Sequence, residues 1–307
     1  MTADKVSVLV VTHDRPELLK KALKSVAEQT YSDIEVVIVE NFVSKQTKQV
    51  VDEFNNCFEG DVIRVNTSEF VNGSEARNLG IENCNSEFVA FLDDDDEWIS
   101  TKIEKQMDLI LNSEDKVGLV YTGLRRVIGN KFYDVPANEK NSGDNFLNIF
   151  SSIPTVTSAI LVKKSLLRME KFDVKQTHWQ EYDLLVRMSS LTYFAVVPDP
   201  ETIIRDDFTS KKRMSNQLDK WILAVERFES KHHNRIQSLP RIIQKNYKTQ
   251  LLKDRIQRME QQSFGGWLKS RLYILQLIKN SKNWKYLLFL IPNMKFSTIQ
   301  NWKSNSI

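Results

Sequence analysis

The chain has 307 residues, of which 41% are hydrophobic and 27% charged, so it can bury a substantial core and is not a disordered polypeptide. Its 43 basic and 40 acidic residues nearly cancel to a net charge of +3, so only the local distribution of charge can indicate a partner. The two cysteines, Cys57 and Cys84, are too few for a disulfide framework and lack the spacing of a zinc site. So few cysteines are typical of a protein from a reducing compartment.

We expect neither a signal peptide nor a transmembrane helix in this sequence. Lys5 precedes a short apolar run, but polar residues and Pro16 follow it where a signal peptide would have a small-residue cleavage site. The longest strongly apolar stretch elsewhere, residues 286–291, is far shorter than the roughly 20 residues that cross a bilayer.

The N-terminal part of the chain alternates between apolar strands and amphipathic helices. Continuous runs rich in β-branched residues, typical of strands buried on both faces, predict strands at 6–11, 34–39, 62–65 and 88–92. The first helix is predicted after a cap at Asp14, and Gly80 would let a later helix, 74–83, approach the sheet closely. This alternation favours a doubly wound α/β sheet, whose ligands bind beyond the carboxyl ends of the strands.

The rest of the chain is expected to extend this sheet and then become helical. Thr101 with Glu104 resembles a capping box that opens a helix through Leu111. Residues 131–148 are polar and irregular and predict a mobile loop near the substrates. Further strands are predicted at 117–122, 155–162 and 193–197, a helix at 182–191, and mainly helices after about residue 210.

A run of five acidic residues, 93–97, directly follows the fourth predicted strand. Their mutual repulsion would be costly without a cation or strong solvation, so we expect a positive group beside them. Carboxylate oxygens suit Mg²⁺ or Mn²⁺, which bind one or two protein carboxylates and complete their shell with water and substrate phosphates. The alternative is a solvated acidic turn before the next helix.

Four segments of the first 110 residues form an ordered set of motifs. They are Val-Thr-His-Asp-Arg at 11–15, Ser25-Val26 with Gln29-Thr30, Ala76-Arg77-Asn78 with Gly80, and Phe91-Leu92 before Asp93–Asp96. In this order they resemble the family-2 nucleotide-sugar glycosyltransferases with the GT-A fold, of the kind that builds bacterial surface polysaccharides. The resemblance implies an α/β fold with a Rossmann-like, mostly parallel central sheet and helices on both faces, to which the sequence adds a helical C-terminal extension.

The resemblance also implies an organisation and an activity. Residues 1–210 would form the catalytic domain, with a nucleotide-sugar-binding half at 1–110 and an acceptor-binding half at 111–210. Residues 211–307 would form a helical region with a basic amphipathic tail. The activity would be inverting transfer of a hexosyl or N-acetylhexosaminyl group from a nucleotide diphosphate donor, expected to be a UDP-sugar, to an acceptor hydroxyl.

The resemblance assigns roles in the donor site to several residues. The residues that it implies for the nucleotide sugar are Thr12, Arg15, Glu40, Arg77, Asp93 and Asp94, and the metal ligand is Asp95, which would bind Mn²⁺ or Mg²⁺. The cation would offset the charge that builds on the departing nucleoside diphosphate. Residues 42–45 depart from the Gly-Ser-x-Asp pattern of relatives, which leaves the preference for uridine open.

The segment 178–184, His-Trp-Gln-Glu-Tyr-Asp-Leu, resembles the family stretch that carries the catalytic base. Glu181 occupies the position of the catalytic aspartate and would remove the acceptor proton, with Asp183 as the alternative base. Without the resemblance, both acids would be first-turn residues stabilised by a helix dipole. Trp179 could stack on an acceptor sugar or belong to the core.

Residues 261–307 contain no Asp or Glu, while lysines and arginine alternate with aromatic residues and leucines. This pattern predicts helices on an anionic membrane surface and a lipid-linked saccharide acceptor, with the protein in the cytoplasm at the inner face of the cell membrane. The alternative is that these helices pack on the catalytic domain and expose their lysines. Nothing resembles a nucleic-acid-reading module, so we expect no nucleic-acid partner.

Two other functions remain open at this point. A non-catalytic, membrane-associated protein that binds nucleotide sugars would fit the unusual segment 40–45. A nucleotidyltransferase with a similar fold would also use an acidic metal site, but it would carry a glycine-rich loop where residues 12–16 read Thr-His-Asp-Arg-Pro.

Overall fold

The computed structural model describes residues 5–113, 116–151, 155–205, 218–262, 264–283 and 286, which divide into two compact units. Of the described residues, the first unit contains 5–146, 155–176 and 180–205. The second unit contains 147–151, 177–179 and the described residues from 218 onward.

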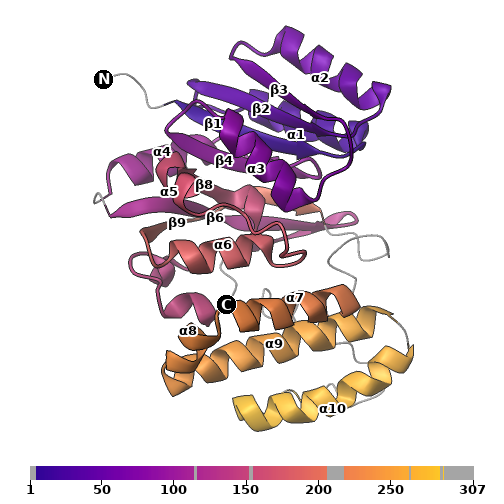
Figure 1. Ribbon diagram of the computed structural model, residues 1–307, viewed down its shortest axis with the longest axis vertical. Helices are drawn as coiled ribbons and strands as arrows, with labels where there is room; N and C mark the ends of the chain where they lie inside the picture. The colour runs from indigo at the N-terminus through magenta and orange to yellow at the C-terminus, as the bar shows by residue number, and fades with distance from the viewer. Residues whose placement is uncertain are drawn as a thin grey trace. The chain divides into compact units, whose positions relative to one another are not determined.

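The first unit is built on a nine-stranded mixed sheet (Figure 1). The strands are β1 (Val6–Thr12), β2 (Ile34–Asn41), β3 (Val62–Thr67), β4 (Phe88–Asp93), β5 (Asp96–Trp98), β6 (Val117–Ile128), β7 (Lys131–Val135), β8 (Ile160–Lys163) and β9 (Tyr193–Arg205). They lie in the order β3-β2-β1-β4-β8-β6-β9-β5, and β7 pairs with β6. Every antiparallel pairing involves β5, β7 or β8, whereas β1 to β4 and the β6–β9 pair are parallel. The predicted α/β sheet is confirmed.

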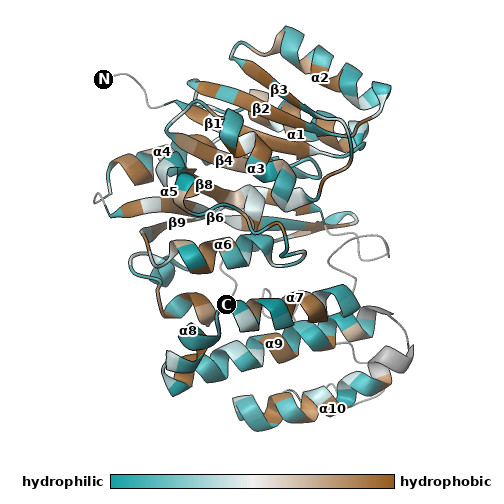
Figure 2. Ribbon diagram, viewed as in Figure 1, coloured by the Kyte–Doolittle hydropathy of each residue, from teal (hydrophilic) through white to brown (hydrophobic). Residues whose placement is uncertain are grey.

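Helices flank this sheet (Figure 1). They are α1 (Pro16–Ala27), α2 (Lys45–Cys57), α3 (Gly73–Asn83), α4 (Lys102–Leu111), α5 (Lys164–Met169) and α6 (Gln180–Met188), with the 3₁₀ turns η1 (Glu139–Asn141) and η3 (Thr157–Ala159). Figure 2 shows that the strands between them are mostly hydrophobic, as strands covered on both faces must be.

The two faces of β1 are covered by different helices, since successive side chains of a strand point to opposite faces. Val8 belongs to a core cluster with Leu23 of α1 and Met107 of α4. Leu9 meets α3 on the other face, where a Cβ atom on Gly80 would lie 2.0 Å from the Leu9 Cδ1 atom. The absence of a side chain at Gly80 therefore permits the close packing of α3 on β1, as the sequence predicts.

Of two predicted helix caps, one is at the wrong residue and the other is at the predicted residue but makes no capping hydrogen bond. Arg15, not Asp14, is the N-cap residue of α1, and Asp14 has a φ of 51° and accepts a 3.0 Å hydrogen bond from the Ser44 N–H. Thr101 is the N-cap residue of α4 but makes no cap bond, because its hydroxyl donates to the Glu201 carboxylate at 2.8 Å. In both cases a partner distant in sequence replaces the local one.

Two predicted element boundaries are also corrected. The segment 131–148 is not entirely irregular, because Lys131–Val135 forms β7 and pairs with β6. Strand β9 does not end at Val197 but continues past Pro198 and Pro200 to Arg205. Its register with β6 shifts there, so the prolines occupy an irregular stretch of the ladder in which their missing N–H groups cost no hydrogen bond.

The second unit is helical, which confirms the predicted C-terminal extension. Its elements are η2 (Asn148–Phe150), α7 (Leu218–Lys231), α8 (His233–Ser238), α9 (Arg241–Gln262) and α10 (Phe264–Ser281). An aromatic cluster forms part of its core, where the Trp179 ring lies edge-on to Trp221 at 5.7 Å and to Phe228 at 5.6 Å. Trp179 is therefore a core residue. Among the described residues, no helix is long and apolar enough to cross a membrane.

Candidate active site

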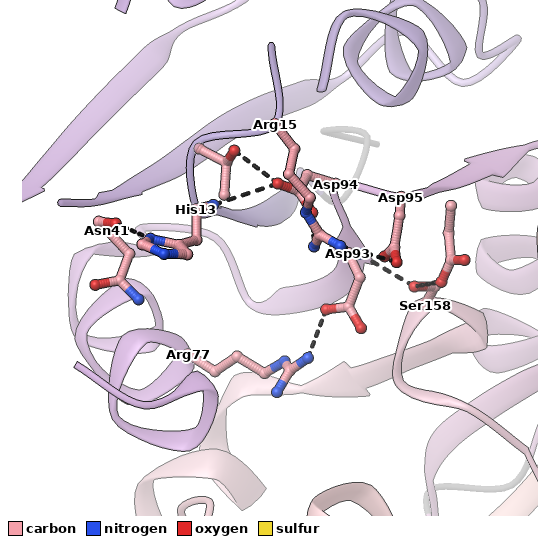
Figure 3. A network of polar contacts seen from close by, with 10 residues as sticks. His13, Arg15, Asn41, Arg77, Asp93, Asp94, Asp95 and Ser158 are labelled. Atoms are coloured by element: carbon pink, nitrogen blue, oxygen red, sulfur yellow. Dashed lines mark hydrogen bonds and ion pairs between the residues drawn. The ribbon is translucent and has the colours of Figure 1, made fainter. Parts of the chain in front are cut away.

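The candidate site lies at the carboxyl ends of β1, β2 and β4. These strands are parallel neighbours, and their registers set Thr12 opposite Glu40 and Val11 opposite Asp93. Residues from three distant parts of the chain therefore meet at one edge of the sheet, where a doubly wound fold binds its ligands. Figure 3 shows the loop after β1 facing the acidic run that follows β4.

Asp94 connects these two loops. Its buried carboxylate accepts hydrogen bonds from the Thr12 hydroxyl at 2.7 Å and from the His13 N–H at 3.3 Å, and it forms an ion pair with Arg15. Burial raises the pKa of Asp94 above its ordinary value, although Arg15 and the Thr12 hydroxyl act in the opposite direction. Asp94 thus holds the loop after β1 and offers no exposed surface of its own.

Two arginines supply the positive charge that the sequence predicts beside the acidic run (Figure 3). Arg15 bridges Asp94 and Asp95, and its contact with the Asp95 carboxylate is 3.0 Å long. Arg77 of α3 pairs with Asp93 at 2.5 Å. The repulsion between the aspartates is therefore offset within the protein, in addition to any bound cation.

Ser158 of η3 also holds the acidic run 93–97 in place, through hydrogen bonds to Asp93 and Asp96. Its hydroxyl accepts a 3.1 Å hydrogen bond from the Asp93 N–H and donates to the Asp96 carboxylate at 2.6 Å. Its carbonyl oxygen accepts from the Trp98 indole at 2.8 Å. These bonds fix the direction in which the aspartates leave β4. The sequence gives no sign of Ser158, because its partners lie about 60 residues away.

The aspartates differ in their availability to a cation. The side chains of Asp93 and Asp95 are 30% and 27% exposed, whereas that of Asp94 is buried. No group of three or more histidine, cysteine or acidic residues in the described part of the chain could hold a metal ion by itself. Two exposed carboxylates fit a Mg²⁺ or Mn²⁺ ion whose remaining ligands are water and substrate phosphates.

Glu40 is held in an arrangement that the sequence did not predict. Arg64 of β3 donates to both oxygens of its carboxylate, at 2.7 and 3.0 Å, and also pairs with Asp52. The Glu40 side chain is completely buried, so it has no exposed oxygen with which to contact a nucleoside in this arrangement. In the sequence, the sign of this ion pair is Arg64 within the otherwise apolar strand predicted at 62–65. The sequence does not identify Glu40 as its partner.

The loops after β2 and β3 are joined by Asn41. Its side-chain oxygen accepts from the Val71 N–H at 3.0 Å, and its carbonyl oxygen contacts the His13 ring nitrogen at 2.8 Å. The His13 ring in turn lies edge-on to Phe70 at 4.8 Å. Phe42 has a φ of 51° and an exposed side chain. The unusual segment 40–45 therefore places a bulky residue in the left-handed region, which residues other than glycine rarely adopt.

The two candidate bases lie in the first turns of α6 in different environments. Asp183 is buried and accepts a 3.0 Å hydrogen bond from Arg187, one turn later. Glu181 is partly exposed. The neighbouring Gln180 accepts a 2.8 Å hydrogen bond from Arg77, which also pairs with Asp93. Arg77 therefore ties the start of α6 to the end of β4.

The sequence of this chain is similar to those of known glycosyltransferases. Residues 7–173 match glycosyl transferase family 2. The amylovoran biosynthesis glycosyltransferase AmsB of Erwinia amylovora is 28% identical over 204 residues, which are 63% of this chain and 67% of that protein. The Escherichia coli UDP-Glc:alpha-D-GlcNAc-diphosphoundecaprenol beta-1,3-glucosyltransferase WfgD is 30% identical over 109 residues, but the match covers only 35% of this chain and 42% of that protein.

A solved structure supports the fold. The mannosyltransferase PcManGT of Pyrobaculum calidifontis, in complex with GDP-Man and Mn²⁺, superposes with a TM-score of 0.59 over 97% of this chain and 87% of that chain. At 14% identity, this likeness concerns the fold alone. Because the family match spans more than half of the 307 residues, the chain belongs to glycosyl transferase family 2 and has a GT-A-like α/β fold.

Proposed function

We propose that this protein is an inverting glycosyltransferase that moves a sugar from a UDP-sugar to a hydroxyl group of a lipid-linked saccharide. The observation that carries the proposal is the polar cluster formed by Thr12, Arg15, Arg77, Asp93 and Asp95. It combines carboxylate oxygens suited to a divalent cation with arginines suited to phosphate. The name of the Escherichia coli relative specifies UDP-Glc and a diphosphoundecaprenol-linked acceptor, which supports these substrate classes.

The donor diphosphate is proposed to bind beside Asp93 and Asp95. A bound Mn²⁺ or Mg²⁺ would supply Lewis-acid stabilisation of the charge that develops on the departing nucleotide. Arg15 and Arg77 orient the two carboxylates, and each guanidinium has enough N–H groups to reach a phosphate oxygen as well. The complex of PcManGT with Mn²⁺ supports a metal in this fold.

The nucleoside is proposed to bind against the loop that follows β1. Thr12 ends β1 directly before this loop, and the buried Asp94 holds the loop in place through Thr12, His13 and Arg15. Glu40 would contribute through Arg64, because its own carboxylate is covered. In the ion pair of Arg64 and Glu40, the Arg64 side chain is partly exposed to solvent and the Glu40 side chain is buried.

Glu181 is proposed as the base that removes the acceptor proton. Inversion requires a base on the face of the sugar opposite the leaving nucleotide. The bond between Gln180 and Arg77 links the first turn of α6 to Asp93, so Glu181 would be held at a fixed position relative to the donor carboxylates. Asp183 is the alternative base, but its ion pair with Arg187 already engages it.

The proposed organisation follows from these roles. Residues 1–210 would form the catalytic domain, with 1–110 binding the nucleotide sugar and 111–210 the acceptor. Residues 211–307 would form a helical region whose tail, 261–307, contacts an anionic membrane; residues 263, 284–285 and 287–307 of the tail lie outside the described part. The proposed place of action is the cytoplasmic face of the cell membrane, in the assembly of a surface glycan such as capsule or lipopolysaccharide.

Calorimetric titration with UDP, GDP and dTDP tests the donor site. We expect UDP to bind about tenfold more tightly than the other two in the presence of Mn²⁺, and EDTA to abolish this binding. Mn²⁺ alone should bind weakly, because only two exposed carboxylates face it. Binding of none of the three nucleotides would contradict the proposal, whereas tight binding without turnover of any sugar donor would favour a non-catalytic binding protein.

Asp95→Ala provides the matched test of the metal ligand. We expect this variant to lose metal-dependent binding of UDP, because one of the two exposed carboxylates is gone. Asp108→Ala, which removes an exposed aspartate of α4, should bind UDP like the wild type. Equal affinities of the two variants would show that Asp95 does not hold the cation.

A further inference from the structure

The outer face of α10 carries a row of exposed leucines. Leu268, Leu272 and Leu275 are 61%, 71% and 51% exposed. Their spacing of four and three residues sets them on one side of the helix. The opposite side packs on α9 and buries Ile274, Leu277 and Ile278. The helix is therefore apolar on both sides, and among the residues that the structure describes only the side with Ile274, Leu277 and Ile278 packs on a partner.

The same outer face is basic. Lys269 and Lys279 of α10 are exposed, and Lys279 lies one turn beyond Leu275 on the leucine side. Residues 261–307 contain no acidic residue, so nothing in this sequence segment neutralises these lysines. Lysine stems can lie along an apolar surface while the ammonium group reaches outward. A leucine row between lysines is therefore suited to a surface that is apolar beneath and negatively charged above.

Within the described part of the helical unit, the other exposed apolar residues do not form such a row. Leu223 of α7 and Ile242 of α9 are 65% and 60% exposed, and each is on a different helix. Single exposed residues of this kind are common on soluble surfaces, whereas a contiguous apolar patch marks a binding surface. The row on α10 thus differs from the background of the same unit.

We propose that the outer face of α10 lies in the interface of an anionic lipid bilayer. Leu268, Leu272 and Leu275 would enter the boundary between head groups and acyl chains, and Lys269 and Lys279 would pair with lipid phosphates. A second copy of this chain fits the face poorly, because a symmetric contact would set lysines against lysines. The inference rests on the proposed lipid-linked acceptor and assigns the membrane contact to α10.

Vesicle flotation of the full-length protein tests this contact. We expect the wild type to float with vesicles of phosphatidylcholine and phosphatidylglycerol, and to remain unbound with phosphatidylcholine alone. Leu272→Asp/Leu275→Asp should lower partitioning at least about tenfold, because it inserts charge into the apolar row. Leu223→Asp is the matched control, since it alters an equally exposed leucine of α7, and it should float like the wild type.

The lysines are tested separately from the leucines. Lys269→Glu/Lys279→Glu should also lower partitioning by about tenfold or more, and wild-type partitioning should decrease with added salt, since lysine–lipid attraction is screened. Lys220→Glu on α7 is the corresponding control and should have little effect. Circular dichroism and UDP calorimetry on each variant should match the wild type, which shows that the fold and the donor site are intact.

The outcomes separate this inference from the proposed function. Unchanged flotation of the leucine variant, or equal flotation on neutral vesicles, would overturn the membrane contact. If the wild type forms a dimer in sedimentation experiments and the leucine variant does not, while the variant still floats, the face is a self-association surface. That result would also overturn the membrane contact. If flotation behaves as expected while no nucleotide binds, the membrane contact stands and the proposed transferase activity fails.

Discussion

Lys102 places an amine in the interior of the first unit. Its Nζ atom donates to Gln106 at 2.7 Å and lies 3.9 Å from the centre of the Trp98 ring. Burial lowers the pKa of Lys102 well below its usual value of 10.5. Between the lowered pKa and 10.5 the unfolded chain binds more protons than the folded chain, so this residue makes the free energy of unfolding increase with pH in that window.

Lys102→Met should remove this pH dependence. We expect the variant to be more stable than the wild type at the acidic end of the window, by about 1 kcal/mol, because an apolar side chain of similar length replaces a buried amine. Urea unfolding across a series of pH values would measure the change. Lys20→Met, which alters an exposed lysine, should keep the wild-type slope, and an unchanged slope in Lys102→Met would contradict the interpretation.

The Arg64–Glu40 pair gives a second prediction at the residue scale. Arg64→Met leaves the buried Glu40 carboxylate without its bidentate partner, so we expect it to lower the free energy of unfolding by roughly 2–3 kcal/mol. Arg64→Met/Glu40→Met removes both charges and should recover most of that loss. A double-mutant cycle by chemical denaturation measures the coupling, and additive effects of the single substitutions would contradict it.

At the scale of secondary-structure elements, the packing of α3 on β1 depends on Gly80. A methyl group there would lie 2.0 Å from the Leu9 side chain. We expect Gly80→Ala to lower the free energy of unfolding by about 1–3 kcal/mol, as overpacking does in other cores. Gly80→Ala/Leu9→Ala should cost less than the sum of its two single substitutions, because the smaller Leu9 side chain makes room. Chemical denaturation of the wild type, the two single variants and the double variant measures this coupling. Additive losses in the free energy of unfolding would contradict the importance of the contact.

The parallel part of the sheet could be predicted because its strands are continuous apolar runs. A strand buried on both faces has no polar alternation, and its carboxyl end is marked by the first polar residues, such as Thr12 and Asp93. The parallel topology then requires these residues to meet, although they are far apart in sequence. The structure confirms this meeting through the register of β1 with β4.

The antiparallel elements could not be predicted in the same way. β5 has three residues and begins within the acidic run, and β7 is an exposed strand that depends on pairing with β6. Short strands of this kind are stabilised by distant partners rather than by their own sequence. The same reason explains why Asp14 does not cap α1, why Thr101 makes no capping bond, and why the roles of Arg64 and Ser158 were missed.

At the scale of the whole molecule, opposite charges are separated along the chain. The acidic run 93–97 belongs to the first unit, whereas residues 261–307 contain only basic charges. A net charge of +3 therefore conceals one region suited to a cation and another suited to an anionic surface. This separation is consistent with a donor site and a membrane contact on different parts of the same chain.

Turnover of the donor that calorimetry identifies tests the central claim most directly. Release of nucleotide from that sugar donor would be measured for the wild type, Glu181→Gln and Asp183→Asn, with water or a lipid-linked saccharide as acceptor. We expect Glu181→Gln to lose about 10²–10⁴-fold in rate while its donor affinity stays unchanged, because a base acts on the acceptor rather than on the donor. Asp183→Asn should retain more activity than Glu181→Gln. Wild-type turnover by Glu181→Gln would contradict the account.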